Sequence, residues 1–207
     1  MRTPLIFILF IVFGCNTPKR IAVVKTAGKF GCIDSKGNWI ITPRWDWLML
    51  GENPKDPILV EKDSLFGFIS PDDDILISPR YNDASIFYEG LAAVGNGSKK
   101  GFINTRGDTV ISFRFDDIFL GFSNGLSDAR INDSCGYIDR EGNVIIPFIY
   151  DVAYPFLSEY AEARTFDGRE LVLDTKGRVI TDETRYANRK LWTRNSADFR
   201  LVIEGPN

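Results

Sequence analysis

Four heptapeptides decide the architecture of this chain, because they recur at nearly constant spacing and share one pattern. They read Gly31-Cys-Ile-Asp-Ser-Lys-Gly37, Gly67-Phe-Ile-Ser-Pro-Asp-Asp73, Gly101-Phe-Ile-Asn-Thr-Arg-Gly107 and Gly136-Tyr-Ile-Asp-Arg-Glu-Gly142. A fifth copy, Leu171-Val-Leu-Asp-Thr-Lys-Gly177, lacks the first glycine. Successive copies begin 36, 34, 35 and 35 residues apart. Self-similarity at a fixed period of this size is the signature of a repeat protein.

Other positions keep a fixed distance from the first glycine of each copy, which we call the register glycine. An apolar pair follows it by nine and ten residues, as in Ile40-Ile41 and Ile145-Ile146. The residue fourteen positions after it is aromatic: Trp45, Tyr81, Phe115 and Tyr150. An acidic or amide residue comes next: Asp46, Asn82, Asp116 and Asp151. An apolar segment such as Leu91-Ala-Ala-Val94 precedes the register glycine.

Each unit is predicted to contain three short strands. The first is the Leu-Ala-Ala-Val type of segment, the second surrounds the register glycine, and the third holds the apolar pair. Asp34, Asp139 and Asp174 can accept hydrogen bonds from backbone N–H groups at the start of a type I turn. The glycine three residues later supplies the positive φ that closes such a hairpin. Asp73 takes that place in the second unit and is expected to adopt the left-handed conformation.

Both faces of the second strand are apolar. Position +1 holds Cys32, Phe68, Phe102, Tyr137 and Val172, and position +2 holds Ile33, Ile69, Ile103, Ile138 and Leu173. Because successive side chains of a strand point to opposite faces, each small sheet is expected to be covered on both sides. The predicted fold class is all-β, with tandem three-stranded antiparallel units of about 35 residues in a solenoid-like or propeller-like array.

The repeated pattern resembles the bacterial WG-repeat family, in which a Trp-Gly pair opens the motif. The resemblance covers residues 21–182, which hold five WG-like β repeats. The namesake tryptophan is absent, since Phe30, Phe66, Lys100 and Cys135 precede the register glycines. The resemblance implies a repeat scaffold, often found on exported proteins, without an agreed activity. Residues 183–207 leave the register and are predicted to be a capping segment, with Phe199–Ile203 as one more strand.

The N-terminus has the pattern of an export signal. One positive charge precedes nine unbroken apolar residues, Leu5 to Phe13, which are too few to span a bilayer as a helix. Gly14-Cys15 ends this run and resembles the bacterial lipoprotein signal, which implies cleavage after residue 14 and acylation of Cys15. Residues 15–20 then form a lipid-anchored tether. An ordinary secretory signal and an uncleaved apolar anchor are the alternatives.

The resemblance to lipoproteins implies a place in the bacterial cell envelope. Asn16 follows the cysteine, and it is not the aspartate that resembles an inner-membrane retention signal. We therefore expect an outer-membrane lipoprotein that faces the periplasm. The membrane partner is then engaged through the N-terminal lipid, since several buried acyl chains hold a protein durably.

Composition excludes several classes of function. The chain has 207 residues, a formal net charge of −3 and no histidine. The acidic balance argues against a nucleic-acid partner. The lack of histidine removes Ser-His-Asp and Cys-His nucleophile systems and His-ligated zinc. We expect no cofactor, no metal and no catalytic residue. The triplet Asp72-Asp73-Asp74 is interpreted as a solvated turn, because it lacks the glycine and spacing of a calcium loop.

Trp47 is the candidate binding residue. It stands sixteen residues after its register glycine, where the other units have Asp83, Asp117 and Val152. It could stack on a sugar or a partner protein, or it could cover the exposed end of the array. Trp39, Trp45, Phe87 and Phe122 are interpreted as core residues. Cys32 and Cys135 are expected to be small buried hydrophobes and not a disulfide, because they lie three units apart.

The sequence therefore predicts a non-catalytic, membrane-anchored repeat scaffold. Its partner would be a protein or a glycan of the cell envelope, since repeat arrays present extended binding surfaces. The alternative is a carboxylate-based hydrolase acting on cell-wall glycans. Such an enzyme needs two carboxylates outside the turns that converge in one pocket, and the sequence marks no such pair. A third possibility is a purely structural envelope protein.

Overall fold

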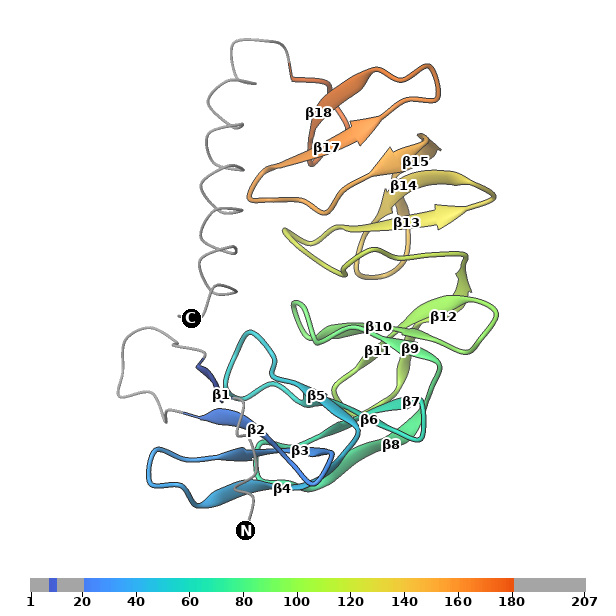
Figure 1. Cartoon of the computed structure of the whole chain (residues 1–207). Helices are drawn as coiled ribbons and strands as arrows, with labels where there is room; N and C mark the ends of the chain where they lie inside the picture. Colours follow the sequence, from blue (N-terminus) through green and yellow to red (C-terminus); the bar gives the residue numbers. More distant parts are fainter. Residues whose placement is uncertain (1–7, 11–20, 181–207) are drawn as a thin grey trace.

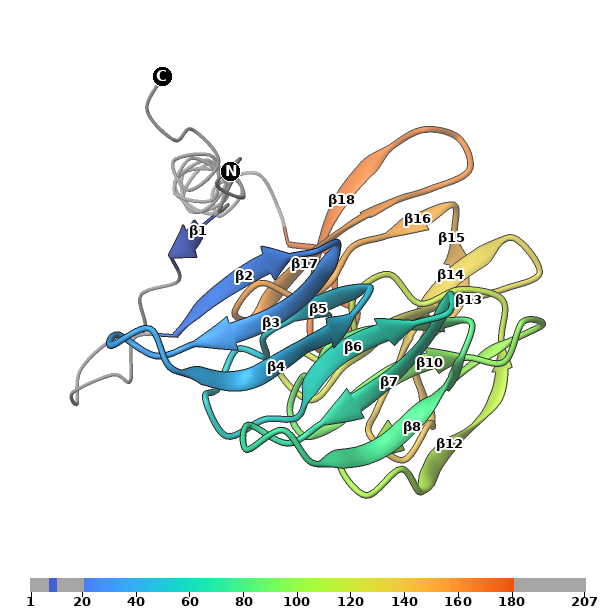
Figure 2. The ribbon, with the colours of Figure 1, turned by 60° about the horizontal axis from the view of Figure 1, so that its bottom comes forward.

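Five small antiparallel sheets follow one another along an arc in the computed structural model, which describes residues 8–10 and 21–180 (Figure 1). Among the described residues every named strand belongs to one of these sheets, and no helix is found. Figure 2 shows the same sheets side by side, with their strands along the arc in chain order. The first and the fifth sheets form its two ends, and no strand pairing joins them in the described part of the chain. The all-β repeat array predicted from the sequence is confirmed.

The sheets contain the following strands. The first has β1 (Ile8–Phe10), β2 (Ala22–Thr26), β3 (Lys29–Ile33) and β4 (Trp39–Trp45). The second has β5 (Trp47–Met49), β6 (Ile58–Lys62), β7 (Leu65–Ile69) and β8 (Ile75–Tyr81). The third has β9 (Asp83–Ala84), β10 (Leu91–Gly95), β11 (Lys100–Asn104) and β12 (Thr109–Phe115). The fourth has β13 (Ser127–Ile131), β14 (Ser134–Ile138) and β15 (Val144–Tyr150), and the fifth has β16 (Val152–Ala153), β17 (Tyr160–Arg164) and β18 (Glu170–Asp174).

A short additional strand links each sheet to the one before it. The last strand of one sheet ends at the repeated aromatic residue, one residue follows, and the chain enters the edge of the next sheet. β5, β9 and β16 arise in this way, and Asp117 makes a single bridge to Arg130 at the same place in the fourth sheet. The sequence predicted three strands per unit and missed this one, because two or three residues are too few to show an alternating pattern.

The residue between the two sheets connects their hairpin turns. Asp46 pairs with Lys29 in the first sheet and accepts a hydrogen bond from the Asp63 backbone N–H in the second, at 2.9 Å. Asp116 repeats the arrangement with Lys99 and with the Asn132 N–H, also at 2.9 Å. The pKa of each carboxyl lies below its usual value, mainly because of the hydrogen bond from the lysine. The recurrent acidic position thus connects neighbouring units.

The register glycine is required by a close approach of two strands. Opposite Gly67, strand β8 carries two extra residues between its partners of Phe66 and Phe68. A Cβ atom on Gly67 would lie 2.5 Å from both the Ile77 carbonyl oxygen and the Pro79 nitrogen. Gly31, Gly101 and Gly136 meet the same backbone obstruction at 2.5–2.6 Å. The glycine therefore allows the last strand to bulge across the second strand.

The predicted turn chemistry is confirmed. The Asp34 carboxylate accepts hydrogen bonds from the N–H groups of Lys36 and Asn38, at 2.8 and 2.9 Å. Asp139 and Asp174 accept the equivalent pairs, and Asn104 and Ser70 do the same with their side-chain oxygens. Gly37 has φ +86°, and Asp73 adopts the left-handed conformation expected of it, with φ +75°.

Neighbouring sheets bury a core at every interface, as the two apolar faces of the second strand predicted. Phe68 packs toward the third sheet and Ile69 toward the first. Phe102 and Ile103 divide in the same way between the fourth and second sheets. The repeated aromatic residue is buried in each of the four interfaces: Trp45, Tyr81, Phe115 and Tyr150. Phe87 and Phe122 are also buried, as predicted.

Trp39 is not a core residue, and the prediction for it was wrong. It opens β4 and is 45% exposed. The same position in other units holds Ile75 and Val144, which are exposed as well. In the apolar pair that follows, only the second residue is buried in each of the first four units, as with Ile77 and Ile146. An apolar residue at the start of this strand therefore does not indicate a buried side chain.

Two substitutions in the first sheet distinguish the stability cost of blocking the close approach of two strands from the cost of a strained φ in the turn. We expect Gly31→Ala to lower the free energy of unfolding by about 2–4 kcal/mol, since backbone atoms of β4 must move. Gly37→Ala should cost about 1 kcal/mol, because its Cβ meets no atom within 4 Å and only its positive φ is strained. Urea unfolding of both variants measures the difference. Equal losses would contradict the role given to the register glycine.

Candidate binding surface

One repeat position, which recurs in four sheets, carries an exposed side chain in three of them and a half-buried serine in the other. This position lies eighteen residues after the register glycine and holds Met49, Ser85, Phe119 and Tyr154. Phe119 is 69% exposed, and Tyr154 and Met49 are also exposed. The rings of Phe119 and Tyr154 meet edge to face, with centroids 6.3 Å apart. We call these four residues the +18 row. Aromatic side chains that stay exposed on a regular scaffold are suited to contact a sugar or a protein.

Two buried polar side chains hold the backbone beneath the aromatic end of this row. The Asp128 carboxylate on β13 accepts a hydrogen bond from the Phe119 N–H at 2.7 Å. The Tyr137 hydroxyl on β14 donates to the Tyr154 carbonyl oxygen at 2.7 Å. Asp128 and Tyr137 are direct partners across their strands, so their side chains share one face of the fourth sheet.

Both of these residues depart from the repeat. The position of Asp128 holds Val23, Leu59 and Ala93 in the preceding units, and that of Tyr137 holds Cys32, Phe68 and Phe102. An aspartate in an apolar register position was the sequence signal that could have located this site. The Ser123 hydroxyl adds a hydrogen bond to the Phe156 carbonyl oxygen at 2.6 Å, which connects the two loops that carry Phe119 and Tyr154.

Asp128 is a buried carboxyl with altered acidity. It is only 5% exposed, and its Oδ1 atom has no hydrogen-bond partner in the described structure. Burial raises the pKa of Asp128 to about 6. The backbone N–H groups of Phe119 and Leu120 favour the ionised form, and the nearby Asp117 carboxylate opposes it. The carboxylate is thus retained at an energetic cost, and in return it fixes the loop that presents Phe119.

Trp47, the binding residue predicted from the sequence, lies on β5 at the second sheet. It is half-buried, and its ring meets Phe66 edge to face at 6.4 Å between centroids. It packs against the core between the second and third sheets. Part of the ring remains accessible, two residues before Met49 of the +18 row. Cys15, the predicted lipidation site, lies outside the described residues.

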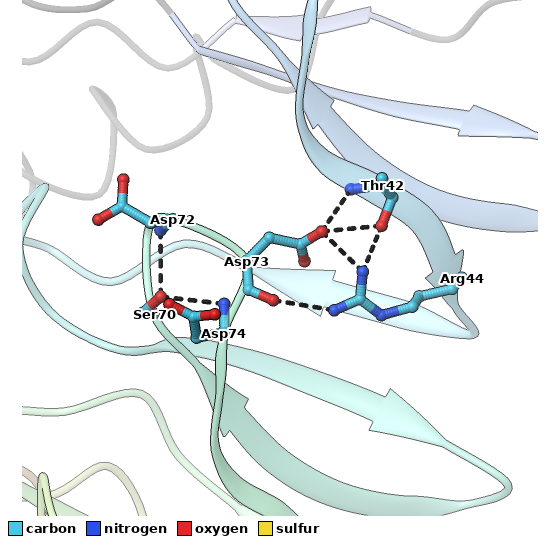
Figure 3. Close-up of polar contacts among 6 residues, drawn as sticks. All are labelled: Thr42, Arg44, Ser70, Asp72, Asp73 and Asp74. Carbon is cyan, nitrogen blue, oxygen red and sulfur yellow. Dashed lines mark hydrogen bonds and ion pairs between the residues drawn. The ribbon is translucent and has the colours of Figure 1, made fainter.

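The acidic triplet forms a contact between the first two sheets, as Figure 3 shows. The Asp73 carboxylate accepts hydrogen bonds from the Thr42 N–H and hydroxyl and from Arg44, at 2.7–3.0 Å. Burial would raise the pKa of Asp73, but the hydrogen bonds from Arg44 and Thr42 hold it below its usual value. Asp72 and Asp74 instead donate their N–H groups to Ser70. The three carboxylates do not share one site, and no metal-ligating cluster is found among residues that the structure describes.

Arg44 belongs to a repeated contact that the sequence analysis missed. Its guanidinium lies 4.9 Å from the ring of Trp45 and donates to the Asp73 carbonyl oxygen at 3.0 Å. Arg80 and Arg114 stack on the next residue in the same way and donate to the carbonyl oxygens of Gly107 and Gly142. Each arginine therefore joins the last strand of one sheet to the turn of the next. The signal was an arginine thirteen residues after three register glycines.

Cys32 and Cys135 are both free and buried, as predicted. Burial raises the pKa of the Cys32 thiol to about 12, so this group remains a neutral thiol at physiological pH. Where the chain is described, no helix is long and apolar enough to cross a membrane.

The raised pKa of Asp128 predicts a pH-dependent gain from Asp128→Asn. The stabilisation from the retained proton is complete below about pH 4 and is lost as the pH rises through about 6. The asparagine variant should therefore unfold with a free energy up to about 3 kcal/mol above that of the original chain at pH 7.5, and the gain should fade toward pH 4. Asp72→Asn, at an exposed turn, is the control for loss of charge. Urea titrations at both pH values test this, and a gain independent of pH would contradict it.

Comparison with solved structures identifies relatives in fold only. The chain is similar to the computationally designed Ika8 protein (TM-score 0.53, 12% identity), over 84% of this chain and 61% of that one. It is similar to Hsv2p of Kluyveromyces lactis (TM-score 0.50, 12% identity), over 83% and 62%. A weaker similarity is to the WD40 beta propeller domain of Doa1 (TM-score 0.41, 12% identity), over 77% and 64%. The chain thus spans about three fifths of the length of these proteins.

Comparison of sequences gives the family. No curated protein matches this chain. The WG containing repeat matches four stretches, residues 30–50, 66–99, 101–135 and 136–167, which together make up more than half of the chain. Each stretch includes the register glycine of one of the first four sheets and the last strand of that sheet, which bulges across the glycine. The chain belongs to the family of WG containing repeat proteins.

Proposed function

We propose that this protein is a non-catalytic scaffold, anchored in the bacterial cell envelope by a lipid on Cys15, that binds a protein or glycan partner along the +18 row. The observation that carries the proposal is the aromatic pair Phe119 and Tyr154. Both rings are exposed, and the backbone beneath each makes a hydrogen bond with a residue that departs from the repeat: the Phe119 N–H donates to Asp128, and the Tyr154 carbonyl oxygen accepts from Tyr137. Binding groups held rigid before contact lose little conformational freedom on association.

The regularity of the array supports a binding role. Its recurrent carboxylates are engaged in turns or in contacts between sheets, as with Asp34, Asp73 and Asp116. Repeat arrays of this kind gain specificity from surface residues that vary between units. In the +18 row, Met49, Ser85, Phe119 and Tyr154 differ in every unit, although the strands around them are alike.

The export signal supports the location. The apolar run before Cys15 fits a lipoprotein signal, and the tether that follows is only six residues long. Asn16 after the cysteine favours the outer membrane, with the array facing the periplasm. The first sheet would then lie close to the lipid surface.

The test is crosslinking in intact bacteria that express the full chain with a C-terminal tag. We expect membrane fractionation and mass spectrometry to find acylated Cys15, and crosslinking to capture one reproducible protein or glycan partner. Cys15→Ala should release the chain from lipid anchoring and abolish the capture. Phe119→Ala combined with Tyr154→Ala should reduce the capture about tenfold while anchoring persists, since each ring contributes about 1 kcal/mol or more.

Phe166→Ala is the matched control, because Phe166 is 63% exposed and lies outside the row. Equal capture by all three anchored chains would contradict the role of the row. Turnover of peptidoglycan that Asp128→Asn abolishes would instead establish the carboxylate-based hydrolase.

A further inference from the structure

The first long strand of every sheet after the first is covered at its edge by chain from the preceding sheet. The residue that follows the repeated aromatic lies between two sheets, and its N–H donates to a carbonyl oxygen on that edge. The four hydrogen bonds run from Asp46 to Glu61 at 2.9 Å, from Asn82 to Gly95 at 3.1 Å, from Asp116 to Arg130 at 2.8 Å and from Asp151 to Arg164 at 2.8 Å. The short strand continues along the edge, where the Ser85 N–H donates to the Ala93 carbonyl oxygen at 2.9 Å. Four edges are therefore closed by the repeat itself.

Strand β2 holds the corresponding edge of the first sheet, and residues 1–20 of the given sequence carry no copy of the repeat pattern. Lys25 stands where the other sheets have Glu61, Gly95 and Arg130, and Val23 stands where the third sheet has Ala93. By this register, the N–H and carbonyl groups of Val23 and Lys25 point outward. Here the edge is covered by β1, which pairs antiparallel with Ile8 opposite Val24 and Phe10 opposite Ala22. Strand β1 lies inside the segment that export would remove.

The edge is suited to an apolar strand. Ala22 and Val24 are buried on one face of β2, and Val23 packs against the core between the first and second sheets on the other. The three residues that occupy the edge in the structure are Ile8, Leu9 and Phe10. An incoming apolar strand would therefore extend both faces of the sheet as well as its hydrogen-bond ladder.

We propose that export turns β2 into a strand acceptor, and that its occupant in the processed protein is an extended apolar segment of another envelope protein, added antiparallel along Ala22–Thr26. This inference rests on the proposed function, because it requires cleavage before Cys15. The six residues of the tether reach at most about 20 Å, so the accepted segment would lie near the membrane surface. An open strand edge is a ready template for such pairing.

The edge lies in the sheet that follows the tether, so a segment supplied at the membrane surface can reach it. The described chain ends at Ile180 by the fifth sheet, at the other end of the arc from β2 (Figure 1). A segment of another protein at the membrane surface meets the edge directly.

The experiment measures binding of a defined peptide to the full chain after export. The protein is purified in detergent from bacterial membranes, and mass spectrometry reports whether its N-terminus is acylated Cys15. The probe is a fluorescent peptide with the sequence of Phe7–Ile11 between lysines, and binding is followed by anisotropy. The Cys15→Ala chain retains residues 1–14, so its edge stays occupied and it should not bind the probe.

Proline on β2 tests the edge itself. Val23→Pro removes an outward N–H group and should weaken binding of the peptide about tenfold, whereas Val23→Ala should bind like the original chain. Lys25→Pro and Lys25→Ala give the same comparison at an exposed position, where the fold is least disturbed. Circular dichroism confirms that each variant is folded.

The outcomes separate this inference from the proposed function. Acylated, folded chain that does not bind the peptide overturns the strand acceptor and leaves the anchored scaffold intact. Binding that appears only after deletion of residues 199–207 assigns the edge to the chain's own C-terminus, which also overturns it. An uncleaved N-terminus refutes the anchoring, and the strand acceptor is refuted with it.

Discussion

The close approach at the register glycine is the constraint on which the other features of this protein depend. Because Gly31, Gly67, Gly101 and Gly136 carry no Cβ, the last strand of each sheet can bulge across the second strand at this point. The bulge turns the end of that strand toward the neighbouring sheet. It places the repeated aromatic residue in the interface, and the next residue enters the edge of the following sheet. One missing side chain per unit thus determines how successive sheets connect.

Stability in such an array is concentrated between the sheets. Each interface contains a buried aromatic residue from one sheet and the two opposite apolar faces of the second strands. In the first three interfaces an arginine adds a contact from the outer strand to the next turn, and Asp73 strengthens the first of these with its carboxylate. The fourth interface lacks this arginine, because Ile149 takes its place. Neighbouring units therefore support one another, as expected for a linear repeat protein.

Features that recur in every unit could be predicted from the sequence, and features that occur once or are very short could not. The turn aspartates, the positive φ of Gly37 and Asp73 and the two-sided burial of Phe68 and Ile69 all follow from spacing and parity. The short linking strands escaped prediction, because two residues have no detectable period. Trp39 was misplaced because the start of an outer strand tolerates apolar residues without burying them. Asp128 and Phe119 are recognisable only by their departure from the repeat, and the structure was needed to bring them together.

These departures support the proposed binding surface on a scaffold that is otherwise regular. Asp128 costs the protein a buried carboxylate, and Tyr137 adds a hydroxyl inside an apolar interface. Both make hydrogen bonds to the backbone beneath the +18 row, in which Met49, Phe119 and Tyr154 are exposed and add little to the core. The most direct test is a photo-crosslinking amino acid placed at Met49 in the anchored chain in living cells, compared with one at Phe166. We predict a discrete adduct from position 49 and none from position 166. Equal labelling from both positions, or labelling from position 166 alone, would contradict the assignment of the binding surface.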